Sequence, residues 1–165
     1  MKYLNISLHG LSGRLHYAIG GDIRTTGDVD KMRPHLKFLS GDYLTYQVKS
    51  QQSGGPAICR LCRLADETSS HIIGSCQQLD RKQFFKEFQT LCSLSQNKIN
   101  FDDMLSNEET LTQFILDPCS FNLKIRIHID DPVKISLLKL SRDFCFSLDK
   151  QRRQKLHELS LTQKY

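Results

Sequence analysis

Four residues with metal-binding side chains constrain this sequence more than any other feature. Cys59, Cys62, His71 and Cys76 follow the spacing C-x2-C-x8-H-x4-C. Three thiolates and one imidazole make a complete tetrahedral ligand set for Zn²⁺, and four protein ligands leave no open position for a catalytic water. The pattern therefore predicts one structural zinc ion in a CCHC zinc knuckle that spans residues 56–80.

The spacing between the last two residues of this set raises a geometric question. On a continuous α-helix, residues five apart are rotated by about 500°, which leaves their side chains roughly 140° apart. His71 and Cys76 would then point in different directions. Gly74 lies between them, and we expect it to end a short helical turn by adopting a positive φ, so that Cys76 returns to the metal.

Two other interpretations of the same residues stay open from the sequence. The cysteines can be buried free thiols that pack as small hydrophobic side chains beside an exposed histidine. A C-x-x-C pair can also be redox-active, although no βαβ pattern surrounds Cys59 and Cys62. The other cysteines, Cys92, Cys119 and Cys145, lie on or beside predicted helices, and we expect them to be small core residues.

Composition places the chain among single globular domains. It has 165 residues, of which 39% are hydrophobic and 25% charged, values typical of one folded domain. No segment approaches the roughly 18 to 20 apolar residues that cross a bilayer, and the N-terminus lacks the apolar core of a signal peptide. We therefore expect an intracellular protein, in the nucleus or the cytoplasm, whose cysteines stay reduced.

Apolar periodicity predicts a mainly α fold, a small helical domain with the zinc knuckle inserted between helices. Apolar side chains three or four residues apart are typical of helices that pack on one face. The predicted helices cover 35–49, 77–93, 107–117 and 132–157. Pro34 suits the first turn of the first helix, Gly41 weakens that prediction, and Asn107 is a good N-cap for the third helix.

The rest of the chain is assigned from local patterns. Residues 121–129 alternate between apolar and polar side chains, which predicts one extended strand. Five glycines break residues 1–28 into short pieces. The expected layout is a weakly structured N-terminal segment at 1–28, a helical domain at 29–157 and a C-terminal tail at 158–165.

The ligand pattern is accompanied by further short motifs. Glu67-Thr68 is an acidic-Thr element just before His71, and residues 39–43 read Leu-Ser-Gly-Asp-Tyr. Together these motifs resemble the C-terminal zinc-binding region of reverse transcriptases from non-LTR (LINE-type) retrotransposons. That region carries a C-x2-C, an acidic-Thr element and an H-x4-C after an L-T-G-x-Y stretch. Segments 111–117 and 141–146 are similar to the tails of such proteins, so the resemblance covers roughly residues 29–155.

The resemblance implies a detached C-terminal piece of such an element, in contact with RNA or DNA and without a polymerase. A polymerase of that family needs a [YF]-x-D-D metal site, and Phe101-Asp102-Asp103 lacks the intervening residue. We expect Asp102 and Asp103 to be a solvated pair beside a helix, and Asp130-Asp131 to mark a helix start. No Gly-rich phosphate loop or nucleophile–base set is present in the sequence, so we expect no enzymatic activity and no small-molecule substrate.

The distribution of charge bears on possible partners. The net charge is +5, and residues 134–165 carry eight basic and three acidic side chains. The basic candidates for contact with RNA or DNA phosphates are Arg60, Arg63, Arg152, Arg153 and Lys155. No aromatic side chain for base stacking lies between residues 62 and 71, so any contact would have low sequence specificity. A solvated basic helix end explains the last three candidates as well.

Different classes of function stay open. In a protein-interaction module, the zinc knuckle would stabilise the fold while the Phe-rich segment 77–93 or the last helix docks a partner. In a non-functional retroelement remnant, the motifs would be relics. An exposed apolar stripe would favour the interaction module, and a continuous basic face that joins Arg60 and Arg63 to Arg152 would favour nucleic acid.

Overall fold

A computed structural model describes residues 26–96, 99–118 and 133–162. Within these ranges the chain is mainly helical and has no β-strand, which confirms the predicted fold class. The elements are α3 (Thr26–Ser40), α4 (Tyr46–Ser53), the π-helix η1 (His71–Ser75), α5 (Lys82–Leu94), α6 (Asp102–Leu105), α7 (Glu108–Leu116) and α8 (Lys134–Thr162).

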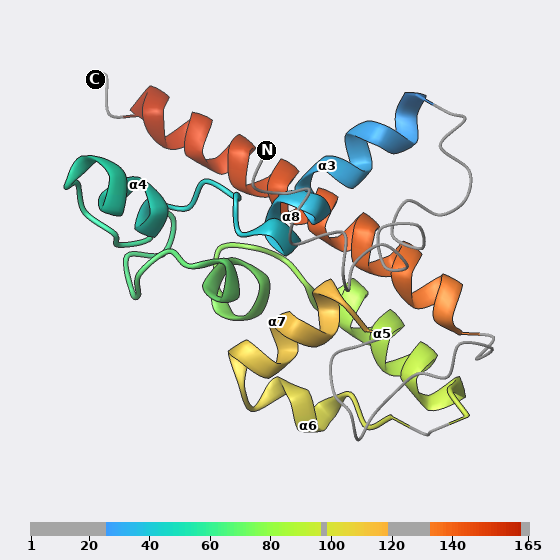
Figure 1. Cartoon of the computed structure of the whole chain (residues 1–165). Helices are drawn as coiled ribbons and strands as arrows, with labels where there is room; N and C mark the ends of the chain where they lie inside the picture. Colours follow the sequence, from blue (N-terminus) through green and yellow to red (C-terminus); the bar gives the residue numbers. More distant parts are fainter. Residues whose placement is uncertain (1–25, 97–98, 119–132, 163–165) are drawn as a thin grey trace.

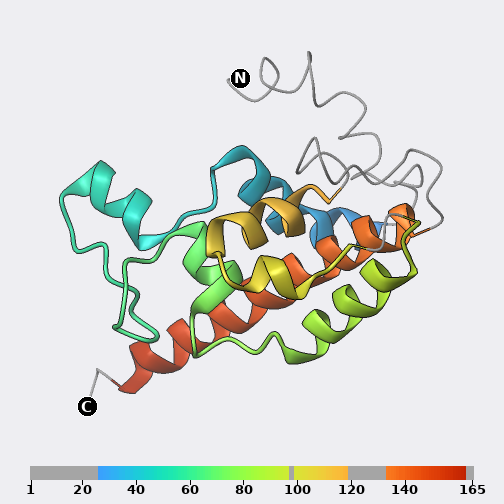
Figure 2. The same ribbon diagram turned by 90° about the horizontal axis from the view of Figure 1, so that it is seen from below.

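Helix α8 is the axis on which the other elements are arranged (Figure 1). Helices α3 and α5 pack along it, and η1 also contacts it. Helices α6 and α7 form a second layer that reaches α8 through η1 and α3 (Figure 2). The buried stripe of α8 contains Leu137, Leu140, Phe144 and Leu148, as its periodicity predicts.

An aromatic cluster forms the centre of the core. Phe88 of α5 is fully buried, and its ring centroid lies 5.6 Å from that of Phe101, 6.3 Å from Phe114 and 5.9 Å from Phe144. These rings come from α5, the residue before α6, α7 and α8. Each buried phenylalanine contributes about 1.5–3 kcal/mol to stability, so the cluster fixes how these elements meet.

The first predicted helix, 35–49, is wrong in its bounds. Helix α3 begins at Thr26 and ends at Ser40, so Pro34 lies inside it instead of in the first turn. Gly41 has a φ of 76°, and the amides of Gly41 and Asp42 donate to the carbonyls of Phe38 and Lys37. This is the Schellman pattern that ends a helix. A second helix, α4, then covers Tyr46–Ser53.

The later helices are closer to their predictions. Helix α7 covers Glu108–Leu116, and the Asn107 side chain accepts hydrogen bonds from the amides of Glu109 and Thr110, which confirms the predicted N-cap. Helix α5 begins at Lys82, later than the predicted 77. Helix α8 continues to Thr162, past the predicted end at 157 and into the predicted tail. The strand predicted at 121–129 and residues 1–25 lie outside the described residues.

Candidate metal centre

A short hairpin carries the first two cysteines. The Cys59 amide donates to the Ala65 carbonyl at 2.8 Å, and the Glu67 amide donates to the Ala57 carbonyl at 2.9 Å. Ile58 and Asp66 form the antiparallel bridge between the two arms. At the tip, the Arg63 amide donates to the Cys59 carbonyl at 2.8 Å, which closes the turn that brings Cys59 and Cys62 together.

Arg63 lies in the left-handed region of backbone conformation at the end of this turn. Its φ is 59°, and it is the one non-glycine residue with a positive φ among the described residues. A non-glycine residue in this region strains the backbone, and the strain persists only where the surrounding structure holds the residue there. The turn therefore requires a conformation that glycine adopts more readily.

A π-helix carries the other two ligands. The Thr68 hydroxyl accepts a hydrogen bond from the His71 amide at 3.0 Å and so caps the start of the turn. The Cys76 amide donates to the His71 carbonyl at 2.8 Å, across five residues instead of four. This wider turn brings His71 and Cys76 to the same side.

The expected role of Gly74 is wrong. The positive-φ glycines among the described residues are Gly41 and Gly54, so Gly74 does not end the turn by a left-handed conformation. Gly74 instead allows η1 to pack closely against α7, because a Cβ atom at this position would lie 3.1 Å from Cγ of Glu108 at the start of α7. The turn instead closes through the i→i+5 hydrogen bond.

The four predicted ligands lie together. One ligand atom from each of Cys59, Cys62, His71 and Cys76 can be chosen so that all lie within 4.8 Å of one another. Sγ of Cys59 is 3.8 Å from Sγ of Cys76, and Sγ of Cys62 is 3.2 Å from Nε2 of His71. Tetrahedral Zn–S bonds of about 2.3 Å place two sulfurs about 3.8 Å apart. These residues are therefore placed to hold one metal ion.

The second nitrogen of the imidazole is also engaged. Nδ1 of His71 lies 2.9 Å from Oγ of Ser75, one turn further along η1. When Nδ1–H donates to this hydroxyl, Nε2 carries the lone pair and faces the sulfurs. A hydrogen bond of this kind fixes the orientation of a metal-binding histidine, so Ser75 supports the ligand geometry.

The thiols in the centre differ in their pKa values. Burial raises the pKa of Cys59 and raises that of Cys76 to about 12. Partial burial also acts on Cys62, but hydrogen bonds to its sulfur, first from the Leu64 amide, outweigh burial and lower its pKa. Burial lowers the pKa of His71, which keeps its imidazole neutral and able to bind a cation.

Arg81 stabilises the end of η1 through hydrogen bonds to backbone carbonyls. Its Nε donates to the Ile73 carbonyl, and one terminal nitrogen donates to the carbonyls of Cys76 and Leu79, each at 2.7 Å. The other terminal nitrogen donates to the Ile72 carbonyl. Arg81 is buried, and it donates to carbonyl groups at and just after the end of the π-helix, where the helical hydrogen bonds stop. The sequence offered no signal that separates it from its neighbour Lys82.

A buried ion pair joins the hairpin to α8. Arg152 donates from one terminal nitrogen to Oε1 of Glu67 at 2.6 Å and from Nε to Oε2 at 3.3 Å. Glu67 is fully buried, and its Oε2 also lies 3.8 Å from Sγ of Cys59. Arg152 donates further to the Leu44 carbonyl at 3.3 Å and lies over the Tyr43 ring.

This contact corrects the expectation that Arg152 extends into solvent. Only 7% of Arg152 is exposed, and its guanidinium is engaged by Glu67 instead of facing outward. The period of α8 directs residue 152 to the same buried face as Leu148. The continuous basic face from Arg60 and Arg63 to Arg152 that would favour nucleic acid is therefore not formed through Arg152.

The remaining basic candidates occupy different surfaces. Arg60 and Arg63 are exposed on the hairpin turn, and Lys155 is half-buried on α8. Arg153 is 66% exposed and pairs with Asp149 at 2.7 Å on the same helix. Two of the five candidates thus lie at the hairpin turn, at the edge of the metal centre.

Buried positive charge flanks the ligand set. Arg81 and Arg152 are both buried, and the buried carboxylate of Glu67 pairs with Arg152. A divalent cation with three thiolates and a neutral imidazole carries one net negative charge. Arg81 and Arg152 supply positive charge near such a centre, and acidic groups act on them as well, Glu67 on Arg152 and Glu108 and Asp80 on Arg81. The surroundings therefore fit an anionic metal centre.

The other cysteines and acidic pairs lie apart from the cluster. Cys92 and Cys145 are fully buried core residues, as predicted, and Cys119 lies outside the described residues. Asp102 and Asp103 are exposed in the first turn of α6, as predicted for a solvated pair. Asp130-Asp131 also lies outside the described residues.

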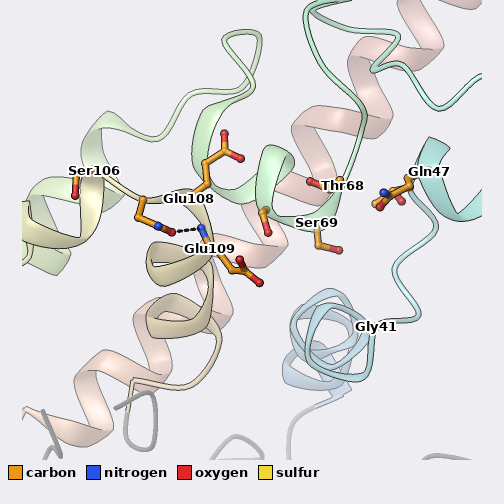
Figure 3. Close-up of a pocket in the computed structure, with 10 residues that line it drawn as sticks. Gly41, Gln47, Thr68, Ser69, Ser106, Glu108 and Glu109 are labelled. Carbon is orange, nitrogen blue, oxygen red and sulfur yellow. Dashed lines mark hydrogen bonds between the residues drawn. The ribbon is translucent and has the colours of Figure 1, made fainter. Parts of the chain in front are cut away.

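A polar groove of about 770 Å³ lies beside η1. Figure 3 shows Thr68, Ser69 and Gln47 on one part of its wall and Glu108 and Glu109 on another. The residues that line it are small, hydroxyl-bearing, amide or acidic, with no cysteine, histidine, lysine or arginine among them. The groove therefore adds no further metal-binding thiol or imidazole to the centre.

Comparison with known proteins adds no identification. No protein family, no curated protein and no solved structure matches the chain. No helix among the described residues combines the length and the apolar character needed to span a membrane. The function is therefore argued from the metal centre itself.

Proposed function

We propose that Cys59, Cys62, His71 and Cys76 hold one structural Zn²⁺ ion in a helical module that has no enzymatic activity of its own. The single observation that carries this proposal is the convergence of three sulfurs and one ring nitrogen of His71 within 4.8 Å of one another. Thiolate and imidazole ligands in tetrahedral spacing are typical of zinc. Four protein ligands complete its coordination, which favours a structural role.

The zinc ion would fasten two separate pieces of backbone. Cys59 and Cys62 come from the hairpin, and His71 and Cys76 come from η1, which packs against α7 and α8. Among the described residues, the hairpin contains one isolated β-bridge, which is too little for a two-stranded segment to be stable alone. We infer that metal binding supplies the stability that this segment lacks.

Metal stoichiometry tests the proposal. We expect one zinc per chain in the purified protein, and loss of that zinc in Cys62→Ser and His71→Ala. Cys92→Ala is the matched control, because Cys92 is buried in the core away from the cluster and should leave the stoichiometry at one. Retention of full zinc content in His71→Ala, or an absence of metal in the wild-type chain, would contradict the proposal.

We further propose that this module associates with RNA or DNA through the knuckle, in keeping with the resemblance to retrotransposon reverse transcriptases. The observation that favours this role is the exposure of Arg60 and Arg63 on the hairpin turn that carries Cys59 and Cys62. Arg153 and Lys155 add charge on α8, whereas Arg152 is withdrawn from the predicted set by its burial. Contacts of this kind would be electrostatic and depend steeply on salt.

Salt-dependent binding tests this association. We expect Arg60→Ala/Arg63→Ala to weaken binding of a single-stranded or duplex oligonucleotide and to lower the salt dependence of the affinity. Lys82→Ala/Lys86→Ala removes the same charge from exposed positions on α5 and serves as the matched control. No binding at low salt would contradict the association and would favour a protein-interaction module. The exposed Ile58 and Leu64 of the hairpin would then be its first candidates for a contact.

A further inference from the structure

The metal centre continues beyond its four ligands into α8. Oε2 of Glu67 lies 3.8 Å from Sγ of Cys59 and accepts a hydrogen bond from Nε of Arg152 at 3.3 Å. One carboxylate oxygen thus contacts both a ligand sulfur and a guanidinium that is 85 residues further along the chain. All three side chains are buried.

The charges in this chain of contacts change when metal binds. A metal-bound Cys59 is a thiolate, so its sulfur can no longer donate to Glu67. Two negative groups then face one another in a buried setting, which is costly unless a positive group lies beside them. Arg152 supplies that group through two hydrogen bonds to the same carboxylate.

We propose that Arg152, on α8, is a positioning residue of the metal centre. It acts through Glu67, whose negative charge it compensates, and so lowers the energetic cost of the buried Cys59 thiolate. The inference rests on the proposed zinc site and extends it beyond the knuckle. It means that the knuckle sequence alone does not contain the whole metal-binding unit.

The same contacts link metal binding to the placement of neighbouring segments. Arg152 also donates to the Leu44 carbonyl and lies 5.5 Å from the centroid of the Tyr43 ring. Tyr43 in turn donates to Oδ1 of Asp149, one turn earlier on α8, at 2.8 Å. The occupied metal site therefore favours the arrangement in which residues 43–45 and the C-terminal half of α8 lie against the hairpin.

Zinc affinity of the full-length chain tests this inference. Apoprotein would be titrated with Zn²⁺ in competition with a chromophoric chelator. We expect Arg152→Met to weaken zinc binding by about 10- to 100-fold, the usual effect of losing an outer partner of a metal ligand. Arg153→Met is the matched control, because it removes the same group from the next, 66% exposed position and should change the affinity by no more than about twofold.

Two further variants separate charge compensation from general damage to the fold. In Glu67→Gln/Arg152→Met, the uncompensated carboxylate is also removed, so zinc affinity should recover most of the loss seen in Arg152→Met. In a Cys62→His background, the metal centre carries one thiolate fewer, and the loss caused by Arg152→Met should shrink. A purely structural role of Arg152 predicts the same loss in both backgrounds and would overturn the inference.

The two proposals fail in different ways. If the wild-type chain binds no zinc, the proposed function itself is wrong. If the wild-type chain binds one zinc and Arg152→Met binds it with equal affinity, the metal site stands and the positioning role of Arg152 is wrong.

Discussion

The amide of Cys76 donates to the carbonyl of His71 across 2.8 Å, and this single bond determines where two of the four ligands point. In an α-helix the two side chains would be roughly 140° apart. The i→i+5 bond widens the turn, so the imidazole and the sulfur face the same centre. A π-turn inside a helical segment is rare and is frequently found at functional sites.

The close approach of η1 and α7 at Gly74 gives the first prediction. A Cβ atom at Gly74 would lie 3.1 Å from Cγ of Glu108 and 3.7 Å from its Cα. Gly74→Val should therefore push α7 away from η1 and destabilise the protein by about 1–3 kcal/mol, the range for overpacking. Chemical denaturation of the zinc-loaded protein measures this.

Gly55→Val is the control for the Gly74 variant. The nearest atom to a Cβ at Gly55 is Oγ of Ser53 at 3.8 Å, an ordinary contact. This variant should change the free energy of unfolding by much less than Gly74→Val. Equal effects of the two substitutions would show that the packing of η1 on α7 does not depend on Gly74.

The ligands of the metal centre could be predicted from the sequence, but the backbone turn that carries two of them could not. The four ligands were found because their identity and spacing along the chain carry the signal. The π-turn was missed because five-residue separation fits either a broken α-turn or a widened one, and glycine at 74 favours both. The hydrogen bond from the Cys76 amide to the His71 carbonyl and the absence of a positive φ at Gly74 distinguish them.

The supporting residues could not be predicted for a different reason. The basic run at the end of α8 predicts an exposed Arg152, either solvated or in contact with phosphates. Its burial depends on Glu67, which is 85 residues away in sequence. The helix pattern predicted the direction of α8 but not its partner, and the same holds for Arg81, which binds backbone carbonyls that have no sequence signature.

Thiol reactivity of the metal-free chain gives the second prediction. Hydrogen bonds to its sulfur lower the pKa of Cys62, whereas burial raises the pKa of Cys59 and of Cys92, the latter to about 12. With zinc removed by a chelator, iodoacetamide at neutral pH should alkylate Cys62 before the core residue Cys92. Peptide mass spectrometry measures the order.

Zinc provides the control for this labelling experiment. In the loaded protein, all four ligand positions should be protected, and Cys92 should stay unreactive in both states because it is fully buried. If Cys92 reacts as fast as Cys62 in the metal-free chain, the assigned difference between these two thiols is wrong.

The pH dependence of stability gives the third prediction, through His35. This side chain is 1% exposed, and its Nε2 lies 2.9 Å from the Leu116 carbonyl. Burial lowers its pKa below 6.5, so the folded protein keeps it neutral while the unfolded chain protonates it near pH 6.5. Below that pH the unfolded state binds more protons, and stability should fall as the pH is lowered.

Denaturation at several pH values measures this contribution. With zinc in excess, wild type should lose more stability between pH 7.5 and about 5.5 than His35→Gln, although the variant starts from a lower stability. If the stabilities of wild type and His35→Gln fall in parallel with pH, His35 does not cause the acid sensitivity. Another process, for example metal release from protonated thiols, would then cause it.

The N-terminus of α7 gives the fourth prediction. Oδ1 of Asn107 accepts hydrogen bonds from the amides of Glu109 and Thr110, each at 3.0 Å. Asn107→Ala leaves these amides without their side-chain partner and should cost about 1 kcal/mol. Asn107→Asp keeps the acceptor and should retain most of the stability. Thermal unfolding of the two variants measures the difference, and equal melting temperatures would argue against a stabilising cap.

The backbone of Arg63 gives the last prediction, which separates stability from binding. Its φ of 59° costs a non-glycine residue conformational energy that glycine does not pay. Arg63→Gly should therefore stabilise the zinc-loaded protein by about 0.5–1 kcal/mol, whereas Arg63→Ala should not. Both variants lose the same exposed guanidinium, so both should weaken oligonucleotide binding equally if Arg63 contacts phosphates. An increase in stability without a loss of binding would confirm the strain at residue 63 and would show that Arg63 does not contact phosphates. No increase in stability in Arg63→Gly would contradict the strain.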